Sequence, residues 1–163
     1  MSIEHWAFGI SIYACYTRRM GDLELAKELF QANSYTFVIV RDAQVIATGT
    51  RDGVGELLEA VAQFGELLQG AALADKVVGK AVALIAVHAG IAKIYTPLGS
   101  QAAQNVLREY GVLFETERLV PLIRNKRNDG ACPLEQLTMP LNEPLAAVNA
   151  LRAFVAERKM LAR

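Results

Sequence analysis

The run ADKVVGKAVALIAVHAG, residues 74–90, is apolar on nearly every side. This pattern predicts a largely buried helix rather than a surface helix with one solvated face. Asp75 precedes the apolar residues as the expected N-cap, and Gly90 follows the last turn as the expected end of the helix. Lys80 lies in the second turn of the predicted helix, where a buried lysine would need a partner. The run therefore predicts a buried helix with one conspicuous polar group.

Helical and strand patterns alternate on both sides of this run. Before it, we expect a helix at residues 21–33 with Asp22 as N-cap, a β-hairpin at 35–49 that turns at 41–44, and an amphipathic helix at 52–70 that Gly70 ends. After it, we expect a strand at 91–96, a helix at 101–110 that Ser100 caps, a strand at 112–120, a polar loop at 124–131, a short helix at 132–139 with Pro133 at its first position, and a last amphipathic helix at 145–155. This order predicts an α/β fold in which helices cover a mixed sheet that begins in a β-hairpin.

Length and charge narrow the classes of protein. A chain of 163 residues can bury a sizeable core, and we expect a single domain over residues 1–163. Residues 1–20 form an N-terminal extension that we expect to be helical and to pack on the domain or on a partner through Trp6, Ile10 and Tyr13. Lys and Arg together number 17, as do Asp and Glu, so the composition gives no indication of a nucleic-acid-binding surface.

The expected location is the cytoplasm. No apolar run approaches the roughly 20 residues that cross a bilayer, so we expect no membrane contact. The first residues lack the basic start of a signal peptide. Cys15 and Cys132 lie far apart in unlike contexts, which favours reduced thiols over a disulfide.

The order of elements from about residue 22 to 120 resembles the cytidine deaminase-like fold. In that fold a helix and a hairpin precede a helix that carries His-Ala-Glu, and a strand then leads to a second helix that opens with Pro-Cys-x-x-Cys. Those motifs supply one His and two Cys ligands to zinc and a Glu that moves protons. The resemblance implies a three-layer α/β/α architecture.

The zinc motifs themselves are missing here. The residues VGKA occupy the place of His-Ala-Glu-Ala, with Val78 at the zinc histidine and Lys80 at the glutamate. In the second motif Pro97 matches, but Leu98 and Gln101 occupy the cysteine positions. The resemblance therefore implies the scaffold without the zinc chemistry, and we expect no metal and no cofactor.

One branch of that fold resembles this chain nearly throughout. The segments GDLELAKEL, YTFVIVRD, ADKVVGKA, RLVPLI and CPLEQL are similar to those of a small prokaryotic family known as a domain of unknown function. Deaminase-like folds commonly self-associate, and 53% of this chain is hydrophobic. We therefore expect a homodimer or a larger assembly.

Lys80 is the first candidate site residue. Desolvation and the dipole near a helix N-terminus would both lower its pKa and make it a base or an amine nucleophile. The alternative is a long side chain that reaches solvent from a buried stem. Asp75, the expected N-cap, is also a candidate ligand-binding residue and could pair with Lys80.

Cys132 is the second candidate. As N-cap of the helix that begins with Pro133, it would meet unpaired amides that stabilise a thiolate, and the upstream cations Arg124, Lys126 and Arg127 would add to this. The alternative is a small buried residue. We expect Glu135 to complete a capping box in the same helix.

The loop RNKRNDG, residues 124–130, precedes this helix. Its cations predict either a solvated face or an anion site that includes Arg127 and Asn128.

The leading hypothesis is a zinc-free deaminase-fold protein that binds a small anionic ligand, nucleobase- or nucleotide-like. If it is an enzyme, Cys132 is the expected nucleophile and Lys80 the base or electrostatic stabiliser. One alternative is a non-catalytic, dimerising interaction module in which both residues are structural. Another is a zinc-dependent deaminase with relocated ligands. The substrate class follows from the fold resemblance alone.

Overall fold

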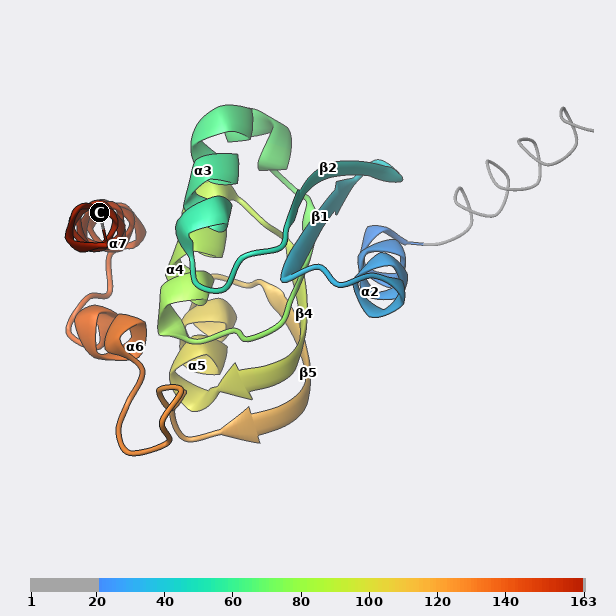
Figure 1. Cartoon of the computed structure of the whole chain (residues 1–163). Coiled ribbons are helices and arrows are strands. Elements are labelled where there is room, and N and C mark those ends of the chain that lie inside the picture. The colour runs from blue at the N-terminus through green and yellow to red at the C-terminus, as the bar shows by residue number, and fades with distance from the viewer. Residues whose placement is uncertain (1–20, 163) are drawn as a thin grey trace, which may run out of the picture.

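The computed structural model describes residues 21–162, so the predicted helical extension at residues 1–20 lies outside the described residues. Figure 1 shows the elements in chain order. They are α2 (Asp22–Ala32), β1 (Phe37–Arg41), β2 (Gln44–Gly49), α3 (Gly55–Phe64), the 3-10 helix η1 (Gly65–Leu68), β3 (Ala72–Asp75), α4 (Lys80–Ala89), β4 (Lys93–Ser100), α5 (Gln101–Glu109), β5 (Leu113–Val120), α6 (Pro133–Thr138) and α7 (Pro144–Leu161).

The sheet is mixed, as the sequence predicts. Its five strands lie in the order β2-β1-β3-β4-β5. Strand β1 pairs antiparallel with β2 and β3, whereas β3, β4 and β5 run parallel. The hairpin of β1 and β2 turns between Arg41 and Gln44, where it was predicted. The three-layer α/β architecture is therefore confirmed.

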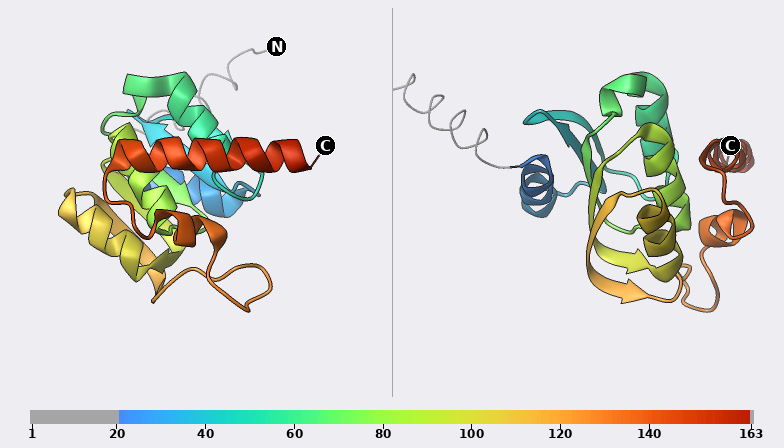
Figure 2. Two further views of the ribbon diagram at one scale, coloured as in Figure 1. Left: turned by 90° about the vertical axis from the view of Figure 1, so that its left-hand side faces the viewer. Right: turned by 180° about the vertical axis from the view of Figure 1, so that it is seen from behind.

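Helix α2 covers one face of the sheet, and α3, α4 and α5 cover the other (Figure 1). Helices α6 and α7 form an outer layer that packs on α4, as the two further views in Figure 2 also show. Helix α4 is thus enclosed by the sheet on one side and by helices on the other. This position explains its nearly uniform apolar sequence, because eight of its ten residues are buried.

The start of α4 differs from the prediction. Residues 72–75 form β3, the central strand, and the helix begins only at Lys80, with Gly79 as N-cap. The prediction of Asp75 as N-cap is therefore wrong, since Asp75 ends β3. The sequence of β3, Ala-Leu-Ala-Asp, is only four residues long and carries no β-branched or aromatic residue, so it does not have the composition typical of a strand. Gly90 ends the helix in the left-handed conformation, as predicted, with φ 74°.

The expected helix at 52–70 is also divided. Helix α3 ends at Phe64, and Gly65, with φ 49°, leads into η1. In α2 the N-cap is Gly21, so the prediction of Asp22 as N-cap is wrong. The Asp22 carboxylate instead accepts hydrogen bonds of 2.9 and 2.8 Å from the backbone N–H groups of Asp42 and Ala43 in the hairpin turn. This contact ties α2 to the hairpin.

Other predicted helix starts are confirmed. The Ser100 side chain accepts a hydrogen bond of 3.1 Å from the Ala103 N–H at the start of α5. Pro133 is the first residue of α6, with Cys132 as N-cap.

Among residues 21–162, no helix is long and apolar enough to cross a membrane.

Candidate functional site

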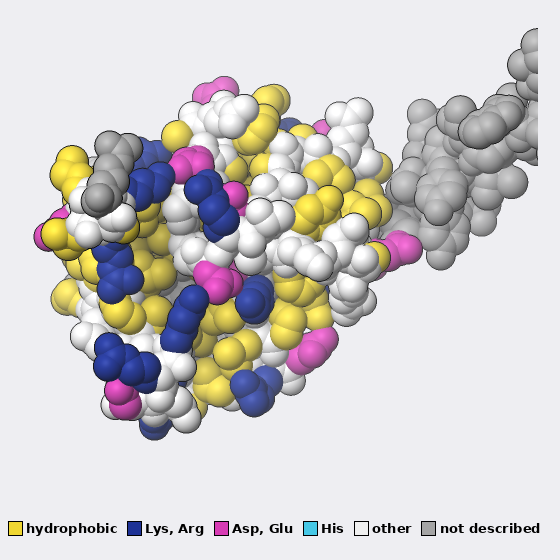
Figure 3. All heavy atoms as spheres, in the orientation of Figure 1, with side chains coloured by type: hydrophobic (Ala, Val, Ile, Leu, Met, Phe, Trp, Pro, Cys, Tyr) yellow, Lys and Arg dark blue, Asp and Glu magenta, His cyan; other side chains and the backbone are white. Residues whose placement is uncertain are grey.

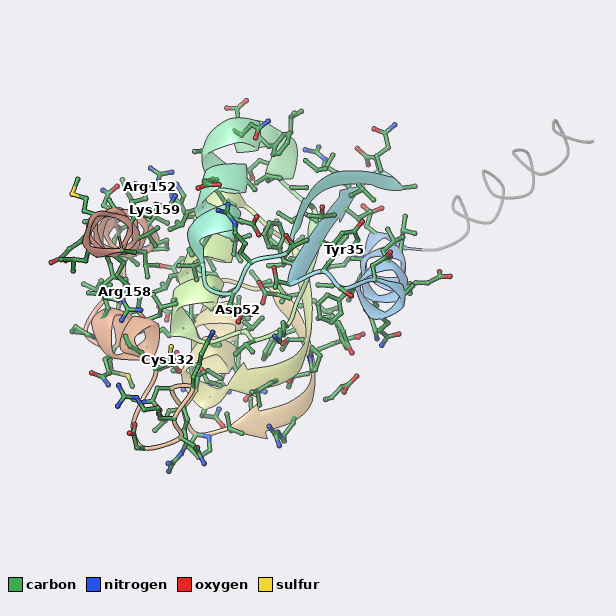
Figure 4. All side chains as sticks on the ribbon, in the orientation of Figure 1. Tyr35, Asp52, Cys132, Arg152, Arg158 and Lys159 are labelled. Carbon is green, nitrogen blue, oxygen red and sulfur yellow. The ribbon has the colours of Figure 1, made fainter. Side chains whose placement is uncertain are left out.

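A cleft of about 760 Å³ lies between the outer helices α6 and α7 and the inner part of the domain. Its walls come from the loop before α3, the loop between β3 and α4, the segment at 123–126, the start of α6 and the second half of α7. The space-filling view shows apolar side chains bordered by Lys and Arg on this face (Figure 3). The labelled residues Asp52, Cys132, Arg158 and Lys159 lie around the cleft (Figure 4).

Glu135 is the most deeply buried charged group of the cleft. It lies in the first turn of α6, and 2% of it is exposed. Its Oε2 accepts a hydrogen bond of 2.9 Å from the backbone N–H of Lys80, the first residue of α4. Its Oε1 is buried and has no hydrogen-bond partner. Glu135 therefore caps α4 across a tertiary contact, and the predicted capping box within its own helix is wrong.

Glycine at position 79 allows the Glu135 carboxylate to approach the start of α4. A Cβ atom at Gly79 would collide with Oε2 of Glu135. The backbone of Gly79 is extended, with φ −92° and ψ −177°, a conformation open to any residue. The close approach of the carboxylate, rather than the backbone angle, is what requires glycine at this position.

Asp75 and Thr36 lie side by side at another part of the cleft. Asp75 pairs with Phe37 across the β1–β3 ladder, and the Lys76 N–H donates to the Thr36 carbonyl at 2.9 Å. The Thr36 hydroxyl is buried without a partner. The Asp75 carboxylate accepts a hydrogen bond of 3.0 Å from the Val77 N–H. Burial raises the pKa of Asp75 to about 7, and the Val77 N–H opposes this rise.

Cations surround the entrance. The exposed Lys and Arg residues that line the cleft are Arg51, Lys76, Arg124, Lys126, Arg158 and Lys159. Asp52 pairs with both Lys126, at 3.0 Å, and Lys76, at 3.4 Å, and these cations hold the pKa of Asp52 below its usual range. The Lys126–Asp52 contact joins the segment before α6 to the loop before α3.

Cys132 is one of the residues that line the cleft, and it is partly exposed. Its backbone N–H donates to the Ile123 carbonyl at 2.8 Å. Cys132 and Glu135 thus both line the cleft from the start of α6.

Lys80 occupies a different place. Only 6% of it is exposed, and it does not line the cleft. Its Nζ donates to the Met139 carbonyl at 2.7 Å and to Asn142 Oδ1 at 3.2 Å. Burial lowers the pKa of Lys80, and the charge of Glu135 opposes this. The side chain neither reaches freely into solvent nor shares the cleft with Cys132; it joins α4 to the α6–α7 connection.

The loop at 124–130 contributes different residues from those expected. Arg127 and Asn128 are exposed and do not line the cleft. Asn128 forms the turn of the loop with φ 59°, and its carbonyl accepts from Arg124 at 3.1 Å. The loop cations that reach the cleft are Arg124 and Lys126, which the sequence had marked only as neighbours of Cys132. Nothing in the sequence pattern placed Arg158 or Lys159 of α7 here.

The residues at the deaminase zinc positions do not fit zinc. Val78 is fully buried, and its N–H and carbonyl bond to Leu98 and Ser100 in a parallel bridge beside β4. Val78, Leu98 and Gln101 carry no imidazole, thiolate or carboxylate ligand. Within residues 21–162, no group of three or more His, Cys, Asp or Glu side chains could hold a metal ion.

Fold and cleft together define a three-layer α/β protein with the deaminase-like order of elements. The chain belongs to the TM1506 family, described as "Domain of unknown function (DUF1893)", whose sequence pattern matches residues 25–155. The prediction of membership in such a family is confirmed. No curated protein matches the chain in sequence.

The chain is also similar to solved structures. The DUF1893 family protein TM1506 from Thermotoga maritima is similar with a TM-score of 0.73 and 23% identity, over 83% of this chain and 88% of that one. RibD from Acinetobacter baumannii matches with a TM-score of 0.43 and 24% identity, over 49% of this chain and 27% of its own. The apo dCMP deaminase of cyanophage S-TIM5 matches with a TM-score of 0.44 and 18% identity, over 58% of this chain and 92% of that one.

Proposed function

We propose that this protein binds a small anionic ligand, nucleobase- or nucleotide-like, in the cleft between the outer helices and the domain, and that it does so without zinc. The observation that carries this proposal is Glu135, which lines the cleft, is 2% exposed and has one carboxylate oxygen without a partner. An unsatisfied buried polar atom costs about 1–3 kcal/mol. Native proteins seldom keep such an atom unless a ligand, ion or water completes it.

Size and charge support the proposal. A volume of about 760 Å³ is within the range of small-molecule sites, roughly 300–1,000 Å³. Arg124 and Arg158 line the entrance and make no ion pair with any residue in the described range. Arg124 donates one N–H to the Asn128 carbonyl at 3.1 Å, and the Arg158 guanidinium lies over the Phe154 ring. The remaining N–H donors of both groups suit an anionic group.

Cys132 is the residue we propose for covalent chemistry, because its thiol lies in the cleft and a thiolate is a strong nucleophile. Lys80 is proposed as a positioning residue rather than a base. Its ammonium binds the α6–α7 connection and its backbone N–H binds Glu135, so it fixes α6 relative to α4. Through that contact it holds Glu135 and Cys132 in place.

Self-association and a cytoplasmic location remain predictions. The edge strand β5 exposes Leu113 and Leu119, with 50% and 38% of each residue accessible, which favours a second copy or another strand as a neighbour. This observation supports the alternative of an interaction module, and light scattering tests it. A monomer near 17.8 kDa at high concentration would contradict self-association.

The ligand proposal is tested by thermal shift with nucleoside monophosphates. Wild-type protein should be stabilised in proportion to ligand concentration. Glu135→Gln should lose this stabilisation, whereas Glu109→Gln, at an exposed acid at the end of α5, should keep it. Equal stabilisation of both variants would show that the ligand binds elsewhere. Stabilisation by none of the compounds would overturn the proposal.

A further inference from the structure

The polar groups of the cleft are sorted by depth. The deep groups are Glu135, whose free oxygen can only accept when ionised, and the Thr36 hydroxyl, which can accept or donate. The exposed groups at the entrance include all six cations of the cleft, together with the carboxylates of Asp52 and Glu59. Lys80, the one buried cation nearby, directs its Nζ to Met139 and Asn142 outside the cleft. Among the described residues, the interior of the cleft therefore holds a carboxylate and no cation, whereas all the cations lie outside.

This arrangement has a chemical consequence for any ligand. An anionic group pushed inward would meet the carboxylate of Glu135 and would have no buried cation to compensate it. A group that donates hydrogen bonds would instead complete the unpartnered Oε1 of Glu135 and the unpartnered hydroxyl of Thr36. The apolar side chains that line the cleft, among them Val54, Val82 and Leu134, suit a flat or aliphatic section of the ligand.

We infer that the ligand enters with a nitrogen-bearing hydrogen-bond donor group toward Glu135 and leaves its anionic group among the cations at the entrance. The inference rests on the proposed function and narrows it to one class: molecules that carry N–H donors, such as an amide, amidine or exocyclic amine, at one end and a phosphate or carboxylate at the other. Simple anions such as inorganic phosphate or a sugar phosphate lack the first of these groups.

Three features oppose the reverse orientation. Glu135 is fixed from behind by the Lys80 N–H, at 2.9 Å, so its free oxygen cannot turn away from an incoming anion. The carboxylate lies so close to Gly79 that a Cβ atom there would collide with Oε2, so the start of α4 borders it on that side. The cations are spread over the loops and α7, so an anion meets them before it reaches the interior.

The test compares matched probes on one protein. Titration calorimetry measures the affinities of adenosine, guanosine, cytidine and uridine 5′-monophosphates, the four corresponding nucleosides, ribose 5-phosphate and inorganic phosphate for wild type, Glu135→Gln and Arg124→Met. At least one nucleotide should bind wild type more than about tenfold tighter than ribose 5-phosphate. Glu135→Gln should weaken the binding of that nucleotide by roughly ten- to a hundredfold, which is the effect of losing a hydrogen bond to a charged group. Its amide would present a donor to the donor of the ligand.

The variants separate the two ends of the ligand. Arg124→Met should lower the affinity for the nucleotides and leave the affinity for the corresponding uncharged nucleoside unchanged. If ribose 5-phosphate and inorganic phosphate bind as tightly as every nucleotide, and Glu135→Gln binds them equally well, the cleft takes simple anions. The orientation inferred here is then wrong while the ligand site stands. If no probe binds, the proposed function fails and this inference with it.

Discussion

The carboxylate of Glu135 accepts a 2.9 Å hydrogen bond from the backbone N–H of Lys80, fifty-five positions earlier in the chain. This contact joins the first turn of α6 to the first residue of α4. The second oxygen of the same carboxylate is buried without a partner, and Glu135 is one of the residues that line the cleft. One side chain thus holds the outer layer on the domain and forms part of the candidate ligand site.

Gly79→Ala should disturb this contact directly. The new Cβ would collide with Oε2 of Glu135, so the hydrogen bond to Lys80 must lengthen or break. We expect a loss of about 1–3 kcal/mol in the free energy of unfolding, as for a buried group left unsatisfied. Gly55→Ala is the control, because there the nearest atom, in Val155, is 3.7 Å away. Urea unfolding measures both, and equal stability of the two variants would contradict the role given to Gly79.

Asp75→Asn should change the pH dependence of stability. The folded-state pKa of Asp75 is raised from 3.8 to about 7, so folded protein holds this proton more tightly than unfolded protein. The stability that the protonated carboxyl contributes is complete below pH 4 and is lost as the pH rises through 7. The amide of Asn keeps an acceptor for the Val77 N–H and cannot ionise. The free energy of unfolding of the variant should therefore rise relative to that of wild type between pH 5 and pH 8.

Denaturant unfolding at several pH values measures this gain, with Glu109→Gln as an exposed-acid control. A stability difference between Asp75→Asn and wild type that stays constant from pH 5 to pH 8 would mean that Asp75 is not desolvated in the folded protein.

Lys80→Met should loosen the α6–α7 connection. The substitution removes the hydrogen bonds from Nζ to the Met139 carbonyl and to Asn142, and it also removes the cost of a desolvated ammonium. These effects oppose each other, and we expect a net loss of about 1 kcal/mol. Hydrogen exchange of the amides at residues 139–143 should become faster, while Lys93→Met, at an exposed lysine, should leave it unchanged.

The same Lys80→Met variant tests the alternative role of Lys80 as a base. Its rate of alkylation at Cys132, measured in a Cys15→Ser background, should remain close to that of the parent. A strong fall in this rate would show that the ammonium acts on the thiol, contrary to its position outside the cleft.

Chelator treatment should leave the melting temperature unchanged. Val78, Leu98 and Gln101 offer no zinc ligand, so no folding free energy is linked to metal at these positions. Elemental analysis of purified protein should find less than stoichiometric zinc. Stoichiometric zinc, with a fall in melting temperature on chelation, would favour the alternative of relocated ligands.

Much of the fold could be predicted because its signals are local. The hairpin, the cap at Ser100, the proline start of α6 and the glycine end of α4 each depend on a few neighbouring residues. Strand β3 was missed because four residues, two of them alanine, acquire strand geometry only by pairing with β1 and β4. Asp75 was misplaced for the same reason.

The site shows the division between sequence and tertiary structure most clearly. The sequence by itself determined that the run at 74–90 holds a buried helix ended by Gly90 and that Cys132 precedes a short helix, because these depend on residue type and local spacing. It placed the start of the buried helix too early, with Asp75 instead of Gly79 as N-cap. Only the tertiary structure decided that Glu135 reaches the start of α4, that Lys80 turns away to Met139, and that Arg158 joins Arg124 at the cleft. Such long-range contacts depend on how α6 and α7 pack on α4, and that packing is set by the shape and burial of the whole domain.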